Sequence, residues 1–262
     1  MIGFNHLGRH GRLGNQMFQY AGLRGIAAHK GYDFCIPPSK FEDEWHDHQL
    51  FECFKLTGLT NIAVCPGPYV QESHFHFDQN LFDNMPDGHN VYGYLQSEKW
   101  FKHIESEIRQ DFEFKNDIHD PCVELIGSVD RPIALHVRRG DYLTNSDNHP
   151  PCTKEYYDAC LSRFDSDRNC IIFSDDPKWC HEQFTDDRFL VSEGGDNVAD
   201  LCMMSLCDDF IIANSSFSWW GSWLSKNPNK KILAPERWFG SGYTKNHNTS
   251  DLYCDNWEVV SV

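Results

Sequence analysis

The second half of the chain shows a regular alternation of short apolar runs and segments whose apolar residues recur at helical spacing. Strands that alternate with helices in this way form βαβ units around a parallel sheet. The pattern predicts strands at 133–137, 170–174, 189–192, 210–214 and 231–235, with helices at 153–164, 177–184, 197–207 and 216–225.

The first half of the chain is less regular. An apolar run at 2–7 predicts a short strand, and residues 15–30 carry apolar positions at helical spacing up to Gly31, a typical helix C-cap. A second apolar run at 32–38 predicts the next strand. From 41 to 124 the chain is rich in histidine and aromatic residues but has no clear period, so no elements are predicted there. The overall pattern predicts an α/β fold.

Polar residues follow three of the predicted strands directly. The segments 138–141, 174–176 and 214–216 each come at the end of an apolar run. Ligands of parallel α/β sheets bind outside the carboxyl ends of the strands. The pattern therefore predicts a ligand site at this edge of the sheet in the second half.

Two of these segments suit a phosphate ligand. Arg138 and Arg139 form an adjacent pair of guanidinium groups, which stay charged and match the geometry of phosphate oxygens. The segment from Asn214 to Ser218 offers hydroxyl groups and backbone amides ahead of a predicted helix, whose amino end favours an anion. Together they predict a clamp for a diphosphate. The alternative is that the arginines form structural ion pairs with Asp141 or a neighbouring acid.

Two further segments leave alternatives open. Ser174, Asp175 and Asp176 could accept hydrogen bonds from a ribose or a base, or could cap the helix predicted from Pro177. The glycine-rich stretch 8–15 matches neither the dinucleotide-binding fingerprint nor the P-loop pattern. It fits a backbone that comes close to a ligand at the start of a helix.

Charge and composition narrow the class of partner. The chain has 262 residues and a formal net charge of −16, which argues against nucleic acid or an anionic membrane as the main partner. The sequence shows no apolar leader and no apolar stretch long enough to cross a membrane. We expect a small-molecule ligand and a cytoplasmic location. The eleven cysteines include no Cys-x-x-Cys pair, so reduced thiols that serve packing are expected.

Histidine pairs raise the question of a metal. The H-x-H triplets at 46–48 and 74–76, the second close to Asp78, have ligand types that zinc or iron uses. Among fourteen histidines, however, chance pairs are expected, and no third ligand recurs near them. The single D-x-D triplet at 165–167 is typical of a turn between a helix and a strand. We therefore expect no metal site.

Four motifs together resemble those of glycosyltransferase family 11, the α-1,2-fucosyltransferases. They are GRLGNQMFQYA at 11–21, HVRRGDY at 136–142, FSDD at 173–176 and NSSFSWWGSWL at 214–224. The HVRR-D pattern alone is shared with α-1,6- and protein O-fucosyltransferases, whereas the combination is much more specific. The resemblance covers residues 11 to about 239.

The resemblance implies a GT-B-like α/β fold of two Rossmann-like halves with parallel sheets. It implies an N-terminal acceptor-side domain at 1–127 and a C-terminal domain at 128–262 that binds GDP-fucose at the carboxyl ends of its strands. The implied activity is an inverting, metal-independent transfer of L-fucose from GDP-fucose to a hydroxyl of a glycan acceptor. The hydroxyl in this family is usually the 2-OH of a galactose.

The resemblance also assigns roles to single residues. Arg138 is expected to contact the β-phosphate of the donor, with His136 and Asp141 as the other expected catalytic residues of the same motif. Asp200 occupies the place of an acidic residue that holds guanine in related α-1,6 enzymes. The remaining expected substrate-binding residues are Gly11, Asn15 and Gln16 in the first half, and Arg139, Ser174, Asp175, Asp176, Asn214, Ser215, Ser216 and Ser218 in the second.

The acceptor and the base that assists its hydroxyl are not identified by the motifs. Arg12 replaces a glycine that is common in bacterial members, and most of the segment 41–124 matches no known part of the family. Asp141, Asp147 and His149 are candidates for the base. Asp141 could equally orient the neighbouring arginine.

Three other functions stay open from the sequence. A related transferase could use another nucleotide sugar or make another fucosyl linkage. A non-catalytic glycan-binding module would use Trp219, Trp220 and Trp223 as a stacking platform, although their spacing is that of a buried helix face. A metallohydrolase would lose its function in the presence of a chelator.

Overall fold

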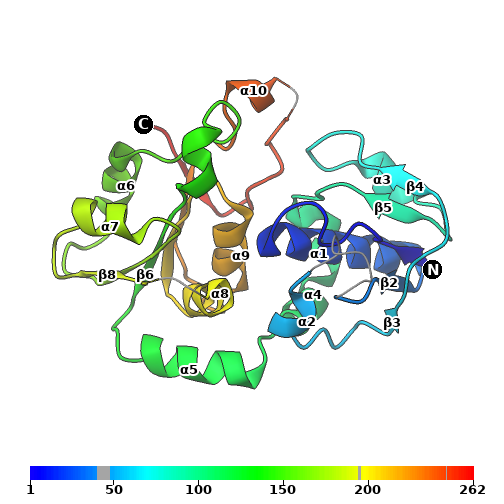
Figure 1. Ribbon diagram of the computed structural model, residues 1–262, viewed down its shortest axis with the longest axis horizontal. Helices are drawn as coiled ribbons and strands as arrows, with labels where there is room; N and C mark the ends of the chain where they lie inside the picture. The colour runs from blue at the N-terminus through cyan, green and yellow to red at the C-terminus, as the bar shows by residue number, and fades with distance from the viewer. Residues whose placement is uncertain (40–47, 194–195, 246) are drawn as a thin grey trace. The chain divides into compact units, whose positions relative to one another are not determined.

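The computed structural model describes residues 1–39, 48–193, 196–245 and 247–262 (Figure 1). The chain forms two compact units that are each built around one parallel sheet. The first unit consists of Met1–Lys115 with Asn246–Cys254, and the second consists of Asn116–Lys245 with Asp255–Val262.

The sheet of the first unit has five strands in the order β3-β2-β1-β5-β4, all parallel. The helix expected over 15–30 is present as α1 and ends at Gly31, whose φ of 68° is the left-handed C-cap expected from the sequence. The region 41–124, for which the sequence predicted no elements, supplies three of the five strands. The bounds are β1 Ile2–Gly3, α1 Leu13–Lys30, β2 Phe34–Ile36, α2 Leu50–Cys53, β3 Asn61–Ile62, β4 Tyr69–Gln71, α3 Gln79–Asn84, β5 Asn90–Tyr92, η1 Glu98–Trp100, η2 Lys102–Ile104 and α4 Glu105–Asp111.

The sheet of the second unit has six parallel strands in the order β11-β10-β9-β6-β7-β8. It contains all five strands and all four helices that the alternating pattern predicted, and adds α5 before them, η3 among them, and α10 and β11 after them. The bounds are α5 Asn116–Ile126, β6 Ile133–Val137, η3 Gly140–Thr144, α6 Lys154–Leu161, β7 Cys170–Ser174, α7 Pro177–Gln183, β8 Phe189–Val191, α8 Asn197–Ser205, β9 Asp209–Ile211, α9 Ser216–Leu224, β10 Ile232–Pro235, α10 Ser241–Thr244 and β11 Glu258–Val260.

The strand β6 is buried along its whole length because helices cover both faces of its sheet (Figure 1). Ile133, Leu135 and Val137 belong to the apolar cluster that includes residues of α6 and α7. Successive side chains of a strand point to opposite faces. His136 therefore faces the other side of the sheet, where it meets α9.

The tryptophans of α9 belong to the core of the second unit. Trp219 and Trp220 are fully buried and Trp223 nearly so. The ring centres of Trp219 and Trp220 lie 5.0 Å apart, and Trp257 packs 5.3 Å from Trp219. Buried in this way, the three rings cannot serve as an exposed stacking platform for a glycan.

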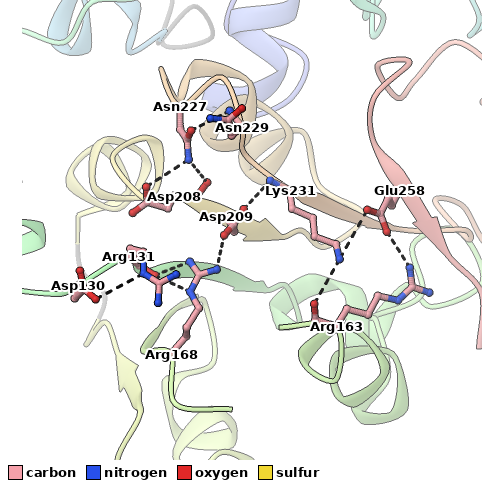
Figure 2. A network of polar contacts seen from close by, with 10 residues as sticks. All are labelled: Asp130, Arg131, Arg163, Arg168, Asp208, Asp209, Asn227, Asn229, Lys231 and Glu258. Atoms are coloured by element: carbon pink, nitrogen blue, oxygen red, sulfur yellow. Dashed lines mark hydrogen bonds and ion pairs between the residues drawn. The ribbon is translucent and has the colours of Figure 1, made fainter. Parts of the chain in front are cut away.

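The amino edge of the second sheet is closed by a network of ion pairs (Figure 2). Asp209, the first residue of β9, pairs with Arg168 and accepts the backbone N–H of Lys231 at 2.6 Å. Arg168 also donates to the carbonyl oxygen of Arg131 at 2.6 Å, and Glu258 accepts from Arg163 at 3.2 Å. These contacts fix the loops that enter the strands. The charged groups of this edge are therefore used within the fold.

Disulfides do not contribute to the fold. All eleven cysteines are free, and all except Cys152 are buried, as expected for thiols that serve packing. None of the helices in the described part of the chain has the length and apolar character that crossing a membrane requires.

Candidate functional site

The carboxyl edge of the second sheet brings together the three polar segments that follow strands in the sequence. In the register of β6 and β7, Val137 lies opposite Ser174, so Arg138 and Asp175 become neighbours just beyond the strand ends. The strand β9 lies on the other side of β6, and Asn214 follows it closely. Parallel strands thus deliver the arginines, the aspartates and the serines to one edge.

Arg138 is held between two carboxylates. Its Nη1 lies 2.6 Å from Asp175 Oδ2, and its Nη2 pairs with Asp141 Oδ1. The guanidinium carbon also lies 5.2 Å from the ring centre of Tyr142. The side chain of Asp175 is 26% exposed, and that of Asp141 is 59% exposed. The ion pairs considered as an alternative from the sequence are present, and they hold the guanidinium at the edge of the sheet.

Arg139 is held by the next aspartate and by an aromatic ring. Its Nε lies 3.0 Å from Asp176 Oδ2, and its guanidinium carbon lies 4.2 Å from the ring centre of Trp179. Its backbone N–H donates to Asp175 at 2.8 Å. Among the described residues, the terminal amino groups of Arg139 have no hydrogen-bond partner. Arg139 is therefore fixed in place with donors left for a ligand.

The segment Ser174-Asp175-Asp176 combines helix capping with the arginine contacts. Asp176 is the N-cap of α7 and accepts the backbone N–H of Trp179 at 3.2 Å. The backbone N–H of Asp176 in turn donates to Ser174 Oγ at 2.9 Å. Capping, one of the two alternatives from the sequence, is thus observed for Asp176. Asp175 is used differently, because its two oxygens bind Arg138 and Arg139.

Asn214 and the serines after it form the turn at which α9 begins. The Asn214 side-chain amide donates to two backbone carbonyls, both at 2.9 Å, which anchors the turn in the fold. Ser215 is the N-cap and accepts the backbone N–H of Phe217 at 3.3 Å. Ser215 and Ser216 are half-buried. They therefore stand at the amino end of a nine-residue helix, where the backbone favours an anion.

His136 lies below this turn as a buried, uncharged side chain. Its Nδ1 is hydrogen-bonded to Ser218 Oγ at 2.8 Å, and its ring centre lies 5.5 Å from that of Phe217. Burial, helped by the charge of Arg138, lowers the pKa of His136 to about 3. The imidazole is therefore neutral near neutral pH. Its geometry suits holding α9 against β6, and a catalytic role for it stays a prediction.

Asp200 lies in the first turn of α8 and reaches back to the end of β8. Its Oδ1 accepts a hydrogen bond from Ser192 Oγ at 2.7 Å. The backbone N–H of Ser192 donates to Ile172 of β7 at 2.8 Å, so Ser192 directly continues the carboxyl end of β8. Burial raises the pKa of Asp200. The structure thus places Asp200 at the same sheet edge as the arginines.

Gly11, Asn15 and Gln16 belong to the first unit and surround the start of α1. Gly11 has a φ of 87°, and a Cβ there would lie 2.0 Å from Asn15 Nδ2, so this position requires glycine. Asn15 Oδ1 accepts from Gln96 at 2.7 Å, and Gln16 Oε1 accepts the backbone N–H of Gln49 at 3.0 Å. These side chains tie two loops to the amino end of α1, at the carboxyl edge of the first sheet.

Three residues that were not singled out in the sequence take part in the edge of the second sheet. Tyr142 Oη donates to the carbonyl oxygen of Asn214 at 3.0 Å, and burial raises the pKa of Tyr142 to about 12. Trp179 packs on one arginine, and Ser192 binds Asp200. The sequence does carry a signal for Tyr142, because it closes the HVRRGDY motif. The contacts of the other two depend on how distant segments pack, which no local pattern indicates.

The described part of the chain contains no group of three His, Cys, Asp or Glu side chains that could hold a metal ion. His74 and His76 stack with ring centres 3.6 Å apart, and Asp78 caps α3 by accepting the backbone N–H of Leu81 at 3.0 Å. In the other triplet, at 46–48, the first two residues lie outside the described residues.

A sequence model described as Glycosyl transferase family 11 matches residues 68–261. The O-antigen biosynthesis glycosyltransferase WbnK of Escherichia coli is 30% identical over 206 residues, which cover 72% of this chain and 67% of that protein. The alpha-1,2-colitosyltransferase of Escherichia coli is 28% identical, with 87% and 90% of the two chains covered. The galactoside alpha-(1,2)-fucosyltransferase 2 of Sus scrofa is 24% identical, with 82% and 68% covered.

Solved fucosyltransferases share the fold. NodZ from Bradyrhizobium has a TM-score of 0.55 at 12% identity, with 84% of this chain and 92% of NodZ covered. NodZ alpha-1,6-fucosyltransferase soaked with GDP-fucose has a TM-score of 0.54 at 13% identity, with 85% and 91% covered. POFUT1 in complex with GDP has a TM-score of 0.59 at 11% identity, with 89% and 97% covered. The expected fold of two Rossmann-like halves of the GT-B type is thereby confirmed.

Proposed function

The chain belongs to glycosyltransferase family 11 and uses a nucleotide sugar, and we propose that it transfers L-fucose from GDP-fucose to a glycan acceptor. The proposed reaction inverts the anomeric centre and is directed to the 2-OH of a galactose. Two findings support these finer assignments. The relative from Sus scrofa is named a galactoside alpha-(1,2)-fucosyltransferase, and GDP-fucose was soaked into crystals of the structurally similar NodZ.

The observation that carries the donor assignment is the pair of arginines fixed at the carboxyl edge of the second sheet. When the bond between fucose and phosphate breaks, negative charge develops on the departing GDP. Preorganised donors aimed at that charge lower the barrier without reorganising during the reaction. We assign Arg138 to the β-phosphate, together with the backbone amides at Ser215 and Ser216. In this scheme protein groups supply the stabilisation, and a metal is not required.

The other residues of this edge are assigned to the nucleotide. Arg139 has terminal amino groups available for the nucleotide. Asp176 and Trp179 fix the position of the Arg139 side chain. Asp200 is proposed to accept hydrogen bonds from guanine, with Ser192 orienting it. The remaining proposed substrate-binding residues are Ser174, Asp175, Asn214 and Ser218 at this edge, with Gly11, Asn15 and Gln16 at the carboxyl edge of the first sheet.

Calorimetric titration in EDTA tests the donor. GDP-fucose, GDP-mannose and UDP-galactose are titrated separately into the wild type and into Arg138→Ala. The proposal expects GDP-fucose to bind without metal and in preference to the other two, and expects the variant to lose this binding. Binding of UDP-galactose in preference to GDP-fucose, or donor binding that disappears in EDTA, would refute the assignment.

A second donor is supported by one specific finding. A relative that is 28% identical over 87% of this chain is named an alpha-1,2-colitosyltransferase. Colitose is the counterpart of L-fucose without the 3-hydroxyl. Competition between nucleotide-activated fucose and colitose for the same galactoside, followed by NMR of the product, distinguishes the two. The same spectrum identifies the linkage, and a product other than an α-1,2-linked galactoside would contradict the proposed acceptor hydroxyl.

We also propose that the protein works in a reducing compartment such as the cytoplasm. Its eleven cysteines are all free, and ten of them are buried. Proteins of oxidising compartments typically use such a number of cysteines for disulfides.

A further inference from the structure

Tyr142 contacts both parts of the proposed diphosphate clamp, which are Arg138 and the turn at the amino end of α9. The guanidinium carbon of Arg138 lies over the tyrosine ring, 5.2 Å from its centre. The hydroxyl group of Tyr142 donates to the carbonyl oxygen of Asn214 at 3.0 Å. Asn214 directly precedes Ser215, the N-cap of α9. One side chain therefore joins two groups that follow different strands.

The spacing of residues after β6 brings this tyrosine to the arginine. Gly140–Thr144 form the short helix η3 directly beyond the strand end. Residues three and four positions apart are neighbours across a helical turn. Asp141 and Tyr142 come three and four positions after Arg138, and both contact its guanidinium group. The turn therefore presents a carboxylate and a ring to the same arginine.

The tyrosine is itself held in place by other rings. His149 stacks on it with ring centres 5.1 Å apart, and the rings of Phe239 and Tyr243 lie 5.6 Å and 5.4 Å from that of His149. Burial raises the pKa of Tyr142 to about 12, so its hydroxyl group stays protonated at neutral pH. The hydroxyl group therefore remains a hydrogen-bond donor to the turn of α9.

The other end of this link is anchored as well. Asn214 is almost completely buried, and its side-chain amide donates to the carbonyl oxygens of Pro150 and Trp238, both at 2.9 Å. Its backbone carbonyl, which Tyr142 binds, is thus part of a turn that is tied to two further loops. Because both ends are fixed, the protein and not the ligand sets the spacing between the guanidinium group and the helix.

We propose that Tyr142 is a positioning residue that sets the spacing between Arg138 and the amino end of α9 for one diphosphate, and thereby makes the site selective for nucleoside diphosphates over monophosphates. The inference rests on the proposed function, which assigns both groups to the phosphates of GDP-fucose. It extends that function by naming the residue on which the selectivity depends. Donors that are fixed before binding lose less freedom when the ligand arrives, so they bind it more tightly.

Calorimetric titrations of GDP and GMP test the inference, because the two nucleotides differ by the β-phosphate alone. We expect the wild type to bind GDP more tightly than GMP by about tenfold or more. Tyr142→Phe keeps the ring but loses the hydroxyl group, and should weaken GDP binding by about threefold to tenfold. Tyr142→Leu loses the ring as well, and should weaken GDP binding by about tenfold or more. In both variants the dissociation constant of GMP should stay within about twofold of the wild type.

Tyr156→Phe is the matched control. The hydroxyl group of Tyr156 also donates to backbone carbonyls of the second unit, those of Ile212 at 2.7 Å and Leu233 at 3.2 Å, but its ring belongs to the apolar core. We expect this variant to bind both nucleotides within about twofold of the wild type. Urea unfolding of each variant measures the loss of stability separately. Tyr142→Phe keeps the test valid if Tyr142→Leu folds poorly.

Two results would overturn the inference. One is that Tyr142→Phe weakens GDP and GMP binding equally, which would show that the tyrosine supports the fold alone. The other is that both Tyr142 variants bind GDP as the wild type does. A failure of the proposed function gives a different result. A wild type that binds GDP no more tightly than GMP would refute the assignment of Arg138 to the β-phosphate, and with it the role of Tyr142.

Discussion

Arg138 shows at the scale of one residue how a structural ion pair and a ligand contact can be the same feature. Asp175 binds one amino group at 2.6 Å, and its other oxygen accepts the backbone N–H of Arg139, so it fixes the direction of the guanidinium. Asp141 binds the other amino group from the exposed side. The sequence posed ion pairing and phosphate binding as alternatives. The geometry makes them compatible, because a fixed guanidinium is what a developing charge on the leaving group requires.

Replacing Arg138 should abolish most of the activity. We expect Arg138→Ala to lower kcat/KM by about 10²–10³-fold, because one preorganised donor to the leaving group is lost. Arg138→Lys should also be poor, since a single ammonium group cannot bind both the carboxylates and a phosphate oxygen in a fixed fork. Initial rates with GDP-fucose and a galactoside measure both variants. Arg163→Ala, at a half-exposed ion pair with Glu258, serves as the control. Activity of Arg138→Ala within about threefold of the wild type would remove this residue from the mechanism.

Asp141 can be tested as a base and as an orienting group with one variant. In Asp141→Asn, a lost general base should lower kcat by about 10²–10⁴-fold while the dissociation constant of GDP-fucose stays unchanged. A lost orienting group should weaken donor binding and lower kcat together by less than about tenfold. We expect the second outcome, because Asp141 pairs with Arg138 in the structure. Calorimetry and steady-state kinetics on the same preparation separate the two roles.

The turn that follows β6 depends on a glycine. A Cβ at Gly140 would lie 2.4 Å from Asp175 Oδ2, so any side chain there must displace the carboxylate that holds both arginines. We expect Gly140→Ala to lower the free energy of unfolding by about 1–3 kcal/mol and to weaken GDP-fucose binding. Urea unfolding and calorimetry measure the two effects.

A double variant distinguishes a local clash at Gly140 from a general loss of the fold. Gly140→Ala combined with Asp175→Ala keeps the added methyl group but removes the carboxylate that it meets. Stability should then recover relative to the sum of the two single variants, while donor binding stays weak because Arg138 has lost one of its two carboxylate partners. Strictly additive losses of stability would show that the alanine acts elsewhere.

At the scale of secondary structure, prediction from sequence succeeded where a strand coincides with an apolar run of the sequence. The strands β6 and β7 have five residues each and are almost fully buried, so their apolar runs are visible in the sequence. In the first unit, β3 has two residues, β4 and β5 have three, and β3 and β4 are partly exposed. The two edge strands, β3 and β4, and the short inner strand β5 carry no readable period. Their pairing is decided by the neighbouring strands, which is why the region 41–124 gave no prediction.

The candidate site was predictable to a similar degree. The residues of the HVRRGDY and FSDD motifs follow long strands, and parallel pairing alone brings their ends together. The contact between Asp200 and Ser192, by contrast, joins the first turn of α8 to the end of β8. A contact of this kind exists only in the folded chain. No spacing in the sequence indicates it.

At the scale of the whole molecule, the two units carry buried titratable groups with opposite effects on stability. In the first unit, Glu72 has its pKa raised by burial from 4.5 to about 7. The contribution of Glu72 to the stability of the first unit is fully present below pH 4.5 and is lost as the pH rises through 7. In the second unit, burial and the charge of Arg138 lower the pKa of His136 from 6.5 to about 3. That contribution is present above pH 6.5 and is lost as the pH falls towards 3.

The stability of the first unit relative to the second should therefore increase as the pH falls. Between pH 6.5 and 5, each pKa shift changes the free energy of unfolding of its unit by about 2 kcal/mol. Acidification therefore stabilises the first unit and destabilises the second by similar amounts. Hydrogen exchange followed by mass spectrometry measures each unit separately, since global unfolding of two units need not be two-state. We expect peptides of β6 and β7 to lose protection relative to those of α1 at pH 5, and to regain it at pH 7.5.

Glu72→Gln should remove the pH response of the first unit and His136→Gln that of the second. Parallel changes in both units would instead show that net charge, and not these two buried groups, governs the response to pH.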